Sequence, residues 1–211
     1  MKHSGFTGRI GVAREDITPP VGIYCRNWGA AKHDAAEGVH RPLTLTALTL
    51  QPDWQAKPLV LVDADLGWWA DMPFGQKFCR RALAELGLHA PQYIFAFSHT
   101  HSAPPLCDPE PQWQGGELLP AYAEKVYTAV VAASHKALAA AQPATLEWHT
   151  GRCSLASNRD LRDGERIVCG YNPEIHADDT VVVGRVTDAA DKRKNSMRSW
   201  DLNTWNWLGR L

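Results

Sequence analysis

The stretch Tyr93–Pro105, YIFAFSHTHSAPP, decides how the rest of the chain is interpreted. Its first five residues are apolar and rich in aromatic side chains, a composition typical of a short buried strand. The polar cluster SHTHS follows at positions 98–102, and two prolines then end the strand. Because residues two apart in an extended backbone point to the same face, we expect His99 and His101 to address one point in space, such as a metal ion.

A second strand and a helix precede this stretch. The apolar run from Leu59 to Val62 is typical of a strand buried on both faces, and the sequence DAD follows it at positions 63–65. A helix is predicted next, with Asp71 as its N-cap and Gly87 just past its end. A strand–helix–strand unit makes its two strands parallel. The two carboxylates either bind a ligand at the strand end or cap the following turn, and both interpretations stay open.

The remaining sequence predicts a mixed α/β architecture. Further strands are expected at 8–17, 43–50, 145–149 and 181–186, and a long helix from Pro120 to about Ala141. Long loops are expected at 21–38 and 107–119, and a polar, turn-rich segment at 158–173. The fold class is therefore α/β, with a mixed, partly parallel sheet, flanking helices and an HxH motif at the C-terminal end of a strand. The predicted organisation is one incomplete domain over residues 1–190 and an atypical, poorly ordered tail over residues 191–211.

The composition is that of an ordinary globular protein of 211 residues, 45% hydrophobic and 21% charged. A formal net charge of −1 without a basic stripe gives no reason to expect nucleic acid as a partner. No apolar run approaches the roughly 20 residues of a membrane span, and no signal peptide is evident, so a cytoplasmic location is expected. Five scattered cysteines without a CxxC pair indicate reduced thiols. The nine tryptophans either line a cleft or fill the core, and the core is the default. The oligomeric state is left open.

An HxH motif at a strand end is a moderately specific signal for metal binding, because imidazole suits zinc. The alternative is a pair of histidines hydrogen-bonded within a polar cluster. Two ligands do not make a zinc site, because zinc takes three or four protein ligands. Further histidines occur at positions 40, 149 and 176, but nothing in the sequence places them near the pair, and each is more typical of a surface residue.

Six stretches of the chain resemble the catalytic domain of the neutral/alkaline, non-lysosomal ceramidase family. They occur in order over about 180 residues: GVAREDITPPVG at 11–22, EGVHRPL at 37–43, DADLGW at 63–68, FSHTHSAPP at 97–105, SNRD at 157–160 and GYNPE at 170–174. No single stretch is decisive, and their order and spacing carry the assignment. One departure is clear, since APP follows the HTHS sequence where the family more typically has GPGG, which affects the loop of the substrate pocket.

This resemblance implies a zinc-dependent amide hydrolase that converts N-acylsphingosine and water to sphingosine and a fatty acid. It implies that His99 is a Zn²⁺ ligand and that His101 handles protons. Arg159 would stabilise the carbonyl oxygen or the developing oxyanion, and Asn158 would contact the substrate. Judged without the resemblance, Arg159 is a solvated loop arginine.

The resemblance also implies a deficit. The family takes further zinc ligands, a histidine, a glutamate and a tyrosine, from sequence beyond the strand that matches 181–187, and here the match stops near Asp191. The expectation is a truncated member with an incomplete zinc site and impaired activity. Two alternatives remain: a metal-dependent hydrolase of a different, soluble amide or ester on the same scaffold, and a non-catalytic remnant.

Overall fold

The computed structural model describes residues 5–188 and 199–200. These residues group into two units, a larger one of residues 7–144 and a smaller one formed by the described residues outside that range. The sequence predicted one domain over 1–190. The larger unit holds the stretch that contains the two histidines. Its elements are β1 (Phe6–Asp16), β2 (Thr44–Gln51), β3 (Leu59–Ala64), α1 (Met72–Leu86), η1 (Ala90–Gln92), β4 (Tyr93–Phe97), η2 (Gly116–Leu118) and α2 (Leu119–Ala140).

The sheet of the larger unit is mixed, as predicted. Its strands lie in the order β4-β3-β2-β1. The pairs β1–β2 and β2–β3 are antiparallel, whereas β3 and β4 are parallel, with Val62 opposite Phe95. The parallel pair is the strand–helix–strand unit expected from the sequence. Its two strands therefore end at the same edge of the sheet, where the DAD and HTH sequences lie.

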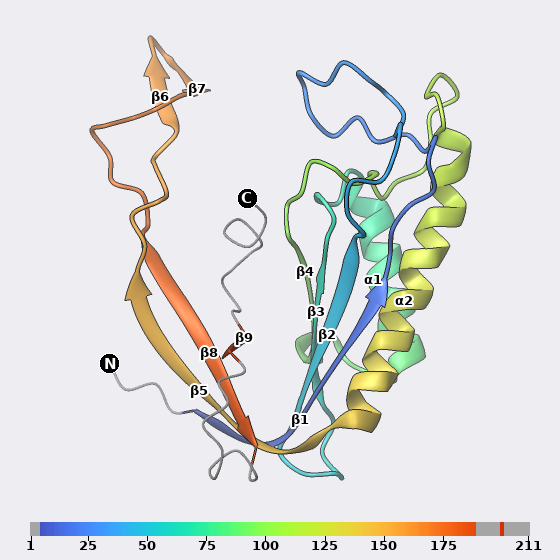
Figure 1. Ribbon diagram of the computed structural model, residues 1–211, viewed down its shortest axis with the longest axis vertical. Helices are drawn as coiled ribbons and strands as arrows, with labels where there is room; N and C mark the ends of the chain where they lie inside the picture. The colour runs from blue at the N-terminus through green and yellow to red at the C-terminus, as the bar shows by residue number, and fades with distance from the viewer. Residues whose placement is uncertain (1–4, 189–198, 201–211) are drawn as a thin grey trace. The chain divides into compact units, whose positions relative to one another are not determined.

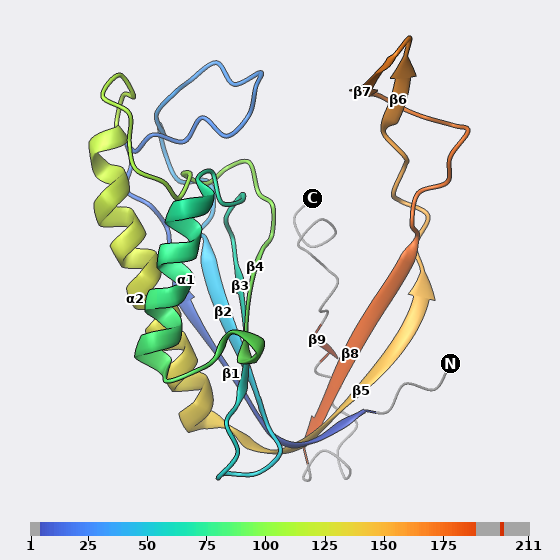
Figure 2. The same cartoon turned by 180° about the vertical axis from the view of Figure 1, so that it is seen from behind.

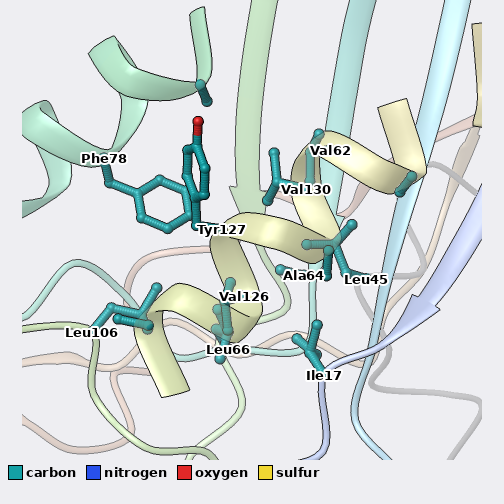
Figure 3. Close-up of a cluster of buried hydrophobic side chains, with 14 of the residues drawn as sticks. Ile17, Leu45, Val62, Ala64, Leu66, Phe78, Leu106, Val126, Tyr127 and Val130 are labelled. Atoms are coloured by element: carbon teal, nitrogen blue, oxygen red, sulfur yellow. The ribbon is translucent and has the colours of Figure 1, made fainter. Parts of the chain in front are cut away.

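Both long helices lie along the same face of this sheet (Figures 1 and 2). The core between the helices and the sheet is made of aliphatic and aromatic side chains from every layer (Figure 3). In β2, Leu45, Ala47 and Thr49 are buried, while the residues between them are partly exposed. Thr49 is the polar residue on this buried side, and its hydroxyl donates to the Gly11 carbonyl at 3.4 Å. Burial of this threonine is therefore accompanied by a hydrogen bond.

The ends of α1 follow the signals in the sequence. The Asp71 carboxylate accepts a hydrogen bond from the backbone N–H of Phe74 at 3.3 Å, which satisfies one of the free donors of the first turn. Gly87 has φ +63°, the left-handed conformation that glycine adopts without steric cost. The helix is therefore fixed at both ends by local chemistry.

The smaller unit contains β5 (Gln142–Arg152), whose first residues belong to the larger unit, followed by β6 (Asp160–Asp163), β7 (Arg166–Cys169), β8 (Thr180–Asp188) and β9 (Ser199–Trp200). Strands β5, β8 and β9 are neighbours in that order, and β6 pairs with β7 in a separate hairpin. The sequence predicted a polar, turn-rich segment at 158–173 and did not indicate this hairpin. Asp163 pairs with Arg166, so the two-residue loop between the strands is Gly164-Glu165, with φ +62° at Gly164, and a glycine in the first position of such a loop is a recognised hairpin signal.

The predicted tail at 191–211 lies outside the described residues except for Ser199–Trp200, which pairs antiparallel with β8. In the described part of the chain, no helix has the length and hydropathy needed to cross a membrane.

Candidate functional site

Four stretches that are far apart in the sequence meet at one end of the four-stranded sheet. The backbone N–H of Ile17 donates to the Leu43 carbonyl at 2.9 Å, which joins the end of β1 to the start of β2. The N–H of Asp65 donates to Thr44, and the N–H of Ser98 donates to Ala64, both at 2.9 Å. These bonds tie together the ends of the GVAREDITPPVG, EGVHRPL, DADLGW and FSHTHSAPP stretches, so most of the sequence resemblance corresponds to one place in the fold.

The two histidines of the HTH sequence are brought together by a left-handed residue. Strand β4 ends at Phe97, and His99 has φ +57°, a conformation that costs a non-glycine residue on the order of 1–3 kcal/mol. The ring centroids of His99 and His101 are 5.1 Å apart, with an angle of 79° between the ring planes. The two rings are therefore close, as expected, but strand alternation was the wrong reason because this segment is not extended.

Two tryptophans line the histidine pair. The Trp68 ring lies 5.4 Å from His99 and 5.5 Å from His101, and Trp28 meets His101 edge-on at 5.1 Å. Both tryptophan side chains are exposed, at 55% for Trp28 and 37% for Trp68. The next residue, Trp69, instead packs into the core against Phe97 and two other phenylalanines. The sequence favoured the core as the default place for the tryptophans and did not indicate the aromatic wall formed by Trp28 and Trp68.

The imidazole of His101 has a defined hydrogen-bond partner. Its Nδ1 lies 2.5 Å from the backbone carbonyl oxygen of Asn27, in the long loop between β1 and β2. Among the described residues, neither ring nitrogen of His99 has a hydrogen-bond partner. A hydrogen bond to the backbone thus holds the His101 ring, whereas the ring nitrogens of His99 make no such bond to the described residues and can bind a ligand. Asn27 could not be predicted from the sequence, because nothing in a loop sequence signals contact with a residue 74 positions away.

The two aspartates after β3 have different environments. Asp65 is 4% exposed, and one of its oxygens accepts from the backbone N–H and the hydroxyl of Thr44, at 2.9 and 3.0 Å. Asp65 therefore holds the start of β2 against the end of β3, a role that differs from both the ligand binding and the capping of the following turn predicted from the sequence. Asp63 retains some exposure, yet burial of its carboxyl group and the nearby charge of Asp65 raise its pKa to about 6, while Arg14 acts in the opposite direction.

The donor set around the pair is too small for a zinc site. Within residues 5–188 and 199–200, no three histidine, cysteine or acidic side chains are grouped so that they could hold a metal ion. His40, His149 and His176 are all exposed. Two imidazoles are fewer than the three or four protein ligands that zinc takes. The described residues therefore do not by themselves fit Zn²⁺.

Asn158 and Arg159 lie in the smaller unit, at the base of the β6–β7 hairpin. The Asn158 carbonyl accepts from Asn172, and the Arg159 carbonyl accepts from Gly170, both at 2.9 Å. The SNRD and GYNPE stretches are therefore side by side. At Gly170, an added Cβ would lie 2.7 Å from the Leu161 side chain, so the close approach favours glycine. The Arg159 side chain is exposed, and the roles predicted for the two site residues of SNRD stay predictions.

A groove on the helical side of the larger unit is separate from these features. It lies between α1 and α2 and is lined by Arg81, Glu85, Tyr127 and Val131, among others. None of the residues predicted to act in catalysis or binding lines it. The histidine pair with its aromatic wall is therefore the best candidate site in the larger unit.

Comparison with known proteins gives a structural match. No family model matches the sequence, and no curated protein does. The structure is similar to neutral ceramidase from Pseudomonas aeruginosa, with a TM-score of 0.65 and 21% identity over 86% of this chain. A ceramidase structure described as complexed with C2 is similar with a TM-score of 0.59 and 22% identity over 86% of this chain. The chain spans about 30% of the length of these proteins. The ceramidase resemblance and the mixed α/β fold inferred from the sequence are thus confirmed, and the chain has the fold of the corresponding part of neutral ceramidase.

Proposed function

We propose that the chain is part of a ceramidase-like hydrolase that cleaves the amide bond of an N-acylated lipid. One observation carries the proposal. The loops at the end of a ceramidase-like sheet place the ring centroids of His99 and His101 5.1 Å apart. The exposed rings of Trp28 and Trp68 lie beside this pair. Imidazoles supply ligand and acid–base chemistry, and exposed indole rings offer an apolar surface with a polar edge, which suits an amphiphilic amide.

In this proposal the side chains have separate tasks. His101 would move a proton through Nε2, because its Nδ1 is engaged with Asn27. Arg159 would stabilise negative charge on the amide oxygen, with Asn158 contacting the substrate. His99 would contribute one ligand to Zn²⁺. The described residues supply at most two imidazoles, so zinc dependence requires ligands from outside them.

The test is hydrolysis of a fluorescent N-acylsphingosine by the chain, with and without added Zn²⁺. Because the described residues supply at most two of the ligands, we expect slow, zinc-dependent release of the fatty acid that falls to background in His99→Ala and His101→Ala. His135→Ala is the matched control, because His135 is an exposed histidine on α2. Its activity should equal that of the unmodified chain.

A panel of soluble N-acyl compounds and esters is assayed in parallel. Faster turnover of a soluble compound than of N-acylsphingosine would replace the lipid substrate in the proposal while keeping hydrolysis. Turnover that is insensitive to His99→Ala, or no turnover of any compound, would refute the proposal and favour a non-catalytic role.

A further inference from the structure

The hydrogen bond to His101 determines which tautomer its neutral ring adopts. A backbone carbonyl oxygen only accepts hydrogen bonds, so the Nδ1 atom that lies 2.5 Å from the Asn27 oxygen must carry the proton. In the neutral ring, Nε2 then carries the lone pair. A ring held in this way presents Nε2 as a base or as a ligand, which is the arrangement found when histidine acts through that atom.

Asn27 is itself held firmly. Its side chain is 8% exposed, and the amide Nδ2 donates to the Ala103 carbonyl at 2.6 Å. Its backbone N–H donates to the Cys25 carbonyl at 2.8 Å. On the β3–α1 loop, a Cβ added to Gly67 would lie 3.4 Å from Nδ2 of Asn27, so that loop also packs against the amide. The Asn27 side chain therefore joins three loops at the candidate site: the β1–β2 loop, the β3–α1 loop and the loop that follows β4.

The neighbours of Asn27 also limit the orientation of the His101 ring. Trp28, the next residue, meets the ring at an interplanar angle of 82°, and Trp68 meets it at 60°. The bond from Asn27 fixes one edge of the imidazole and the two indoles restrict its faces. Displacing Asn27 would move its carbonyl and Trp28 together, because the two residues are adjacent in the chain.

We propose that Asn27 is a positioning residue: its buried amide fixes the β1–β2 loop so that its carbonyl holds His101 as the Nδ1–H tautomer with Nε2 free. Loss of the amide would release the loop and allow His101 to populate the Nε2–H tautomer. Only the catalytic consequence rests on the proposed function. The tautomer itself is a property of the folded chain and can be measured without turnover.

The experiment records long-range ¹H–¹⁵N NMR spectra of the full chain labelled at histidine, at a pH where imidazole is neutral. In the unmodified chain, we expect His101, assigned by its loss in His101→Gln, to show a protonated Nδ1 and an unprotonated Nε2. In Asn27→Ala and Asn27→Asp the signals should shift toward the Nε2–H pattern. Aspartate has nearly the same shape as asparagine but cannot donate to Ala103 when ionised.

The matched control is Asn172→Ala in the smaller unit. Asn172 is also 8% exposed, and its Nδ2 donates to the Asp160 carbonyl at 2.8 Å, so the substitution removes an equivalent buried amide. It should leave the His101 signals unchanged. An Nε2–H tautomer in the unmodified chain would overturn the proposal even if the Asn27 variants fail to fold, and so would Asn27→Asp spectra identical to those of the unmodified chain. A correct tautomer without hydrolysis would instead refute the proposed function alone.

Discussion

Replacement of Asp65 by alanine tests how the end of the sheet beside the histidine pair is held together. Asp65 is 4% exposed, and its carboxylate accepts two hydrogen bonds from Thr44, at 2.9 and 3.0 Å. Asp65→Ala removes a hydrogen-bonded charge and leaves the partly buried N–H of Thr44 without its acceptor. Hydrogen bonds to charged groups contribute about 1.5–3 kcal/mol each, and an unsatisfied buried donor costs about 1–3 kcal/mol. Because the two effects overlap, we expect a loss of about 3 kcal/mol of unfolding free energy.

Two measurements check this expectation. Urea unfolding followed by circular dichroism gives the overall loss. Hydrogen exchange at the Thr44 amide gives the local effect, because in the native state this N–H donates to Asp65. If about 2 kcal/mol of the loss is local, the Thr44 amide should exchange roughly 30-fold faster in the variant. Asp65→Asn keeps the shape and one carbonyl acceptor, so its effects should be intermediate.

Asp63→Ala is the matched control, two residues away on the same strand end. Asp63 is the more exposed of the two aspartates and makes no hydrogen bond to Thr44 among the described residues, so its removal should leave Thr44 exchange unchanged. Equal effects of the two alanine variants, or a loss below about 0.5 kcal/mol for Asp65→Ala, would show that the carboxylate does not hold the two strands together.

Three further expectations concern pH, packing and helix capping. Because the pKa of Asp63 is raised from 3.8 to about 6, the folded state disfavours its charge, and stability falls as pH rises from about 4 to about 6. Asp63→Asn should therefore stabilise the chain above pH 6 and have no effect below about pH 4, and the same gain at both pH values would contradict this. In Gly11→Ala the new methyl group would lie 1.8 Å from the Ala137 carbonyl oxygen of α2, so we expect the unfolding free energy measured in urea to fall by about 1–3 kcal/mol. Gly38→Ala is the control, because the space around Gly38 is open and its unfolding free energy should not change. Asp71→Ala removes the N-cap of α1 and should cost about 1 kcal/mol, whereas Glu85→Ala on the exposed side of the same helix should change the melting temperature little.

Local chemistry made much of the fold predictable. The apolar run at Tyr93–Phe97 is β4 with the same bounds as predicted, and the aspartate and glycine at the ends of α1 act as the sequence indicated. These features depend on neighbours within a few positions, which the sequence displays directly. The β6–β7 hairpin was missed although Gly164 signals its turn, because its strands are only four residues long and too short to show a period.

The candidate site was predictable only in part. The sequence indicated the histidine pair, because two polar imidazoles directly follow an apolar strand. It did not indicate that Trp68 would face the pair while Trp69 enters the core, since neither residue lies in a strand or helix whose period would separate them. It also did not indicate Asn27, which resembles any other polar loop residue until the chain folds.

The sequence by itself determined where the main strands and the two long helices lie, that β3 and β4 are parallel, and which strand end carries the imidazoles. Short-range preferences and hydrophobic patterning are sufficient for those features. Only the tertiary structure decided how the imidazoles are presented: the left-handed backbone at His99, the carbonyl of Asn27 at Nδ1 of His101, and the indole of Trp68 beside both rings. The physical reason is that these contacts join loops separated by dozens of residues, and loop positions depend on the packed sheet and helices that bring their ends together.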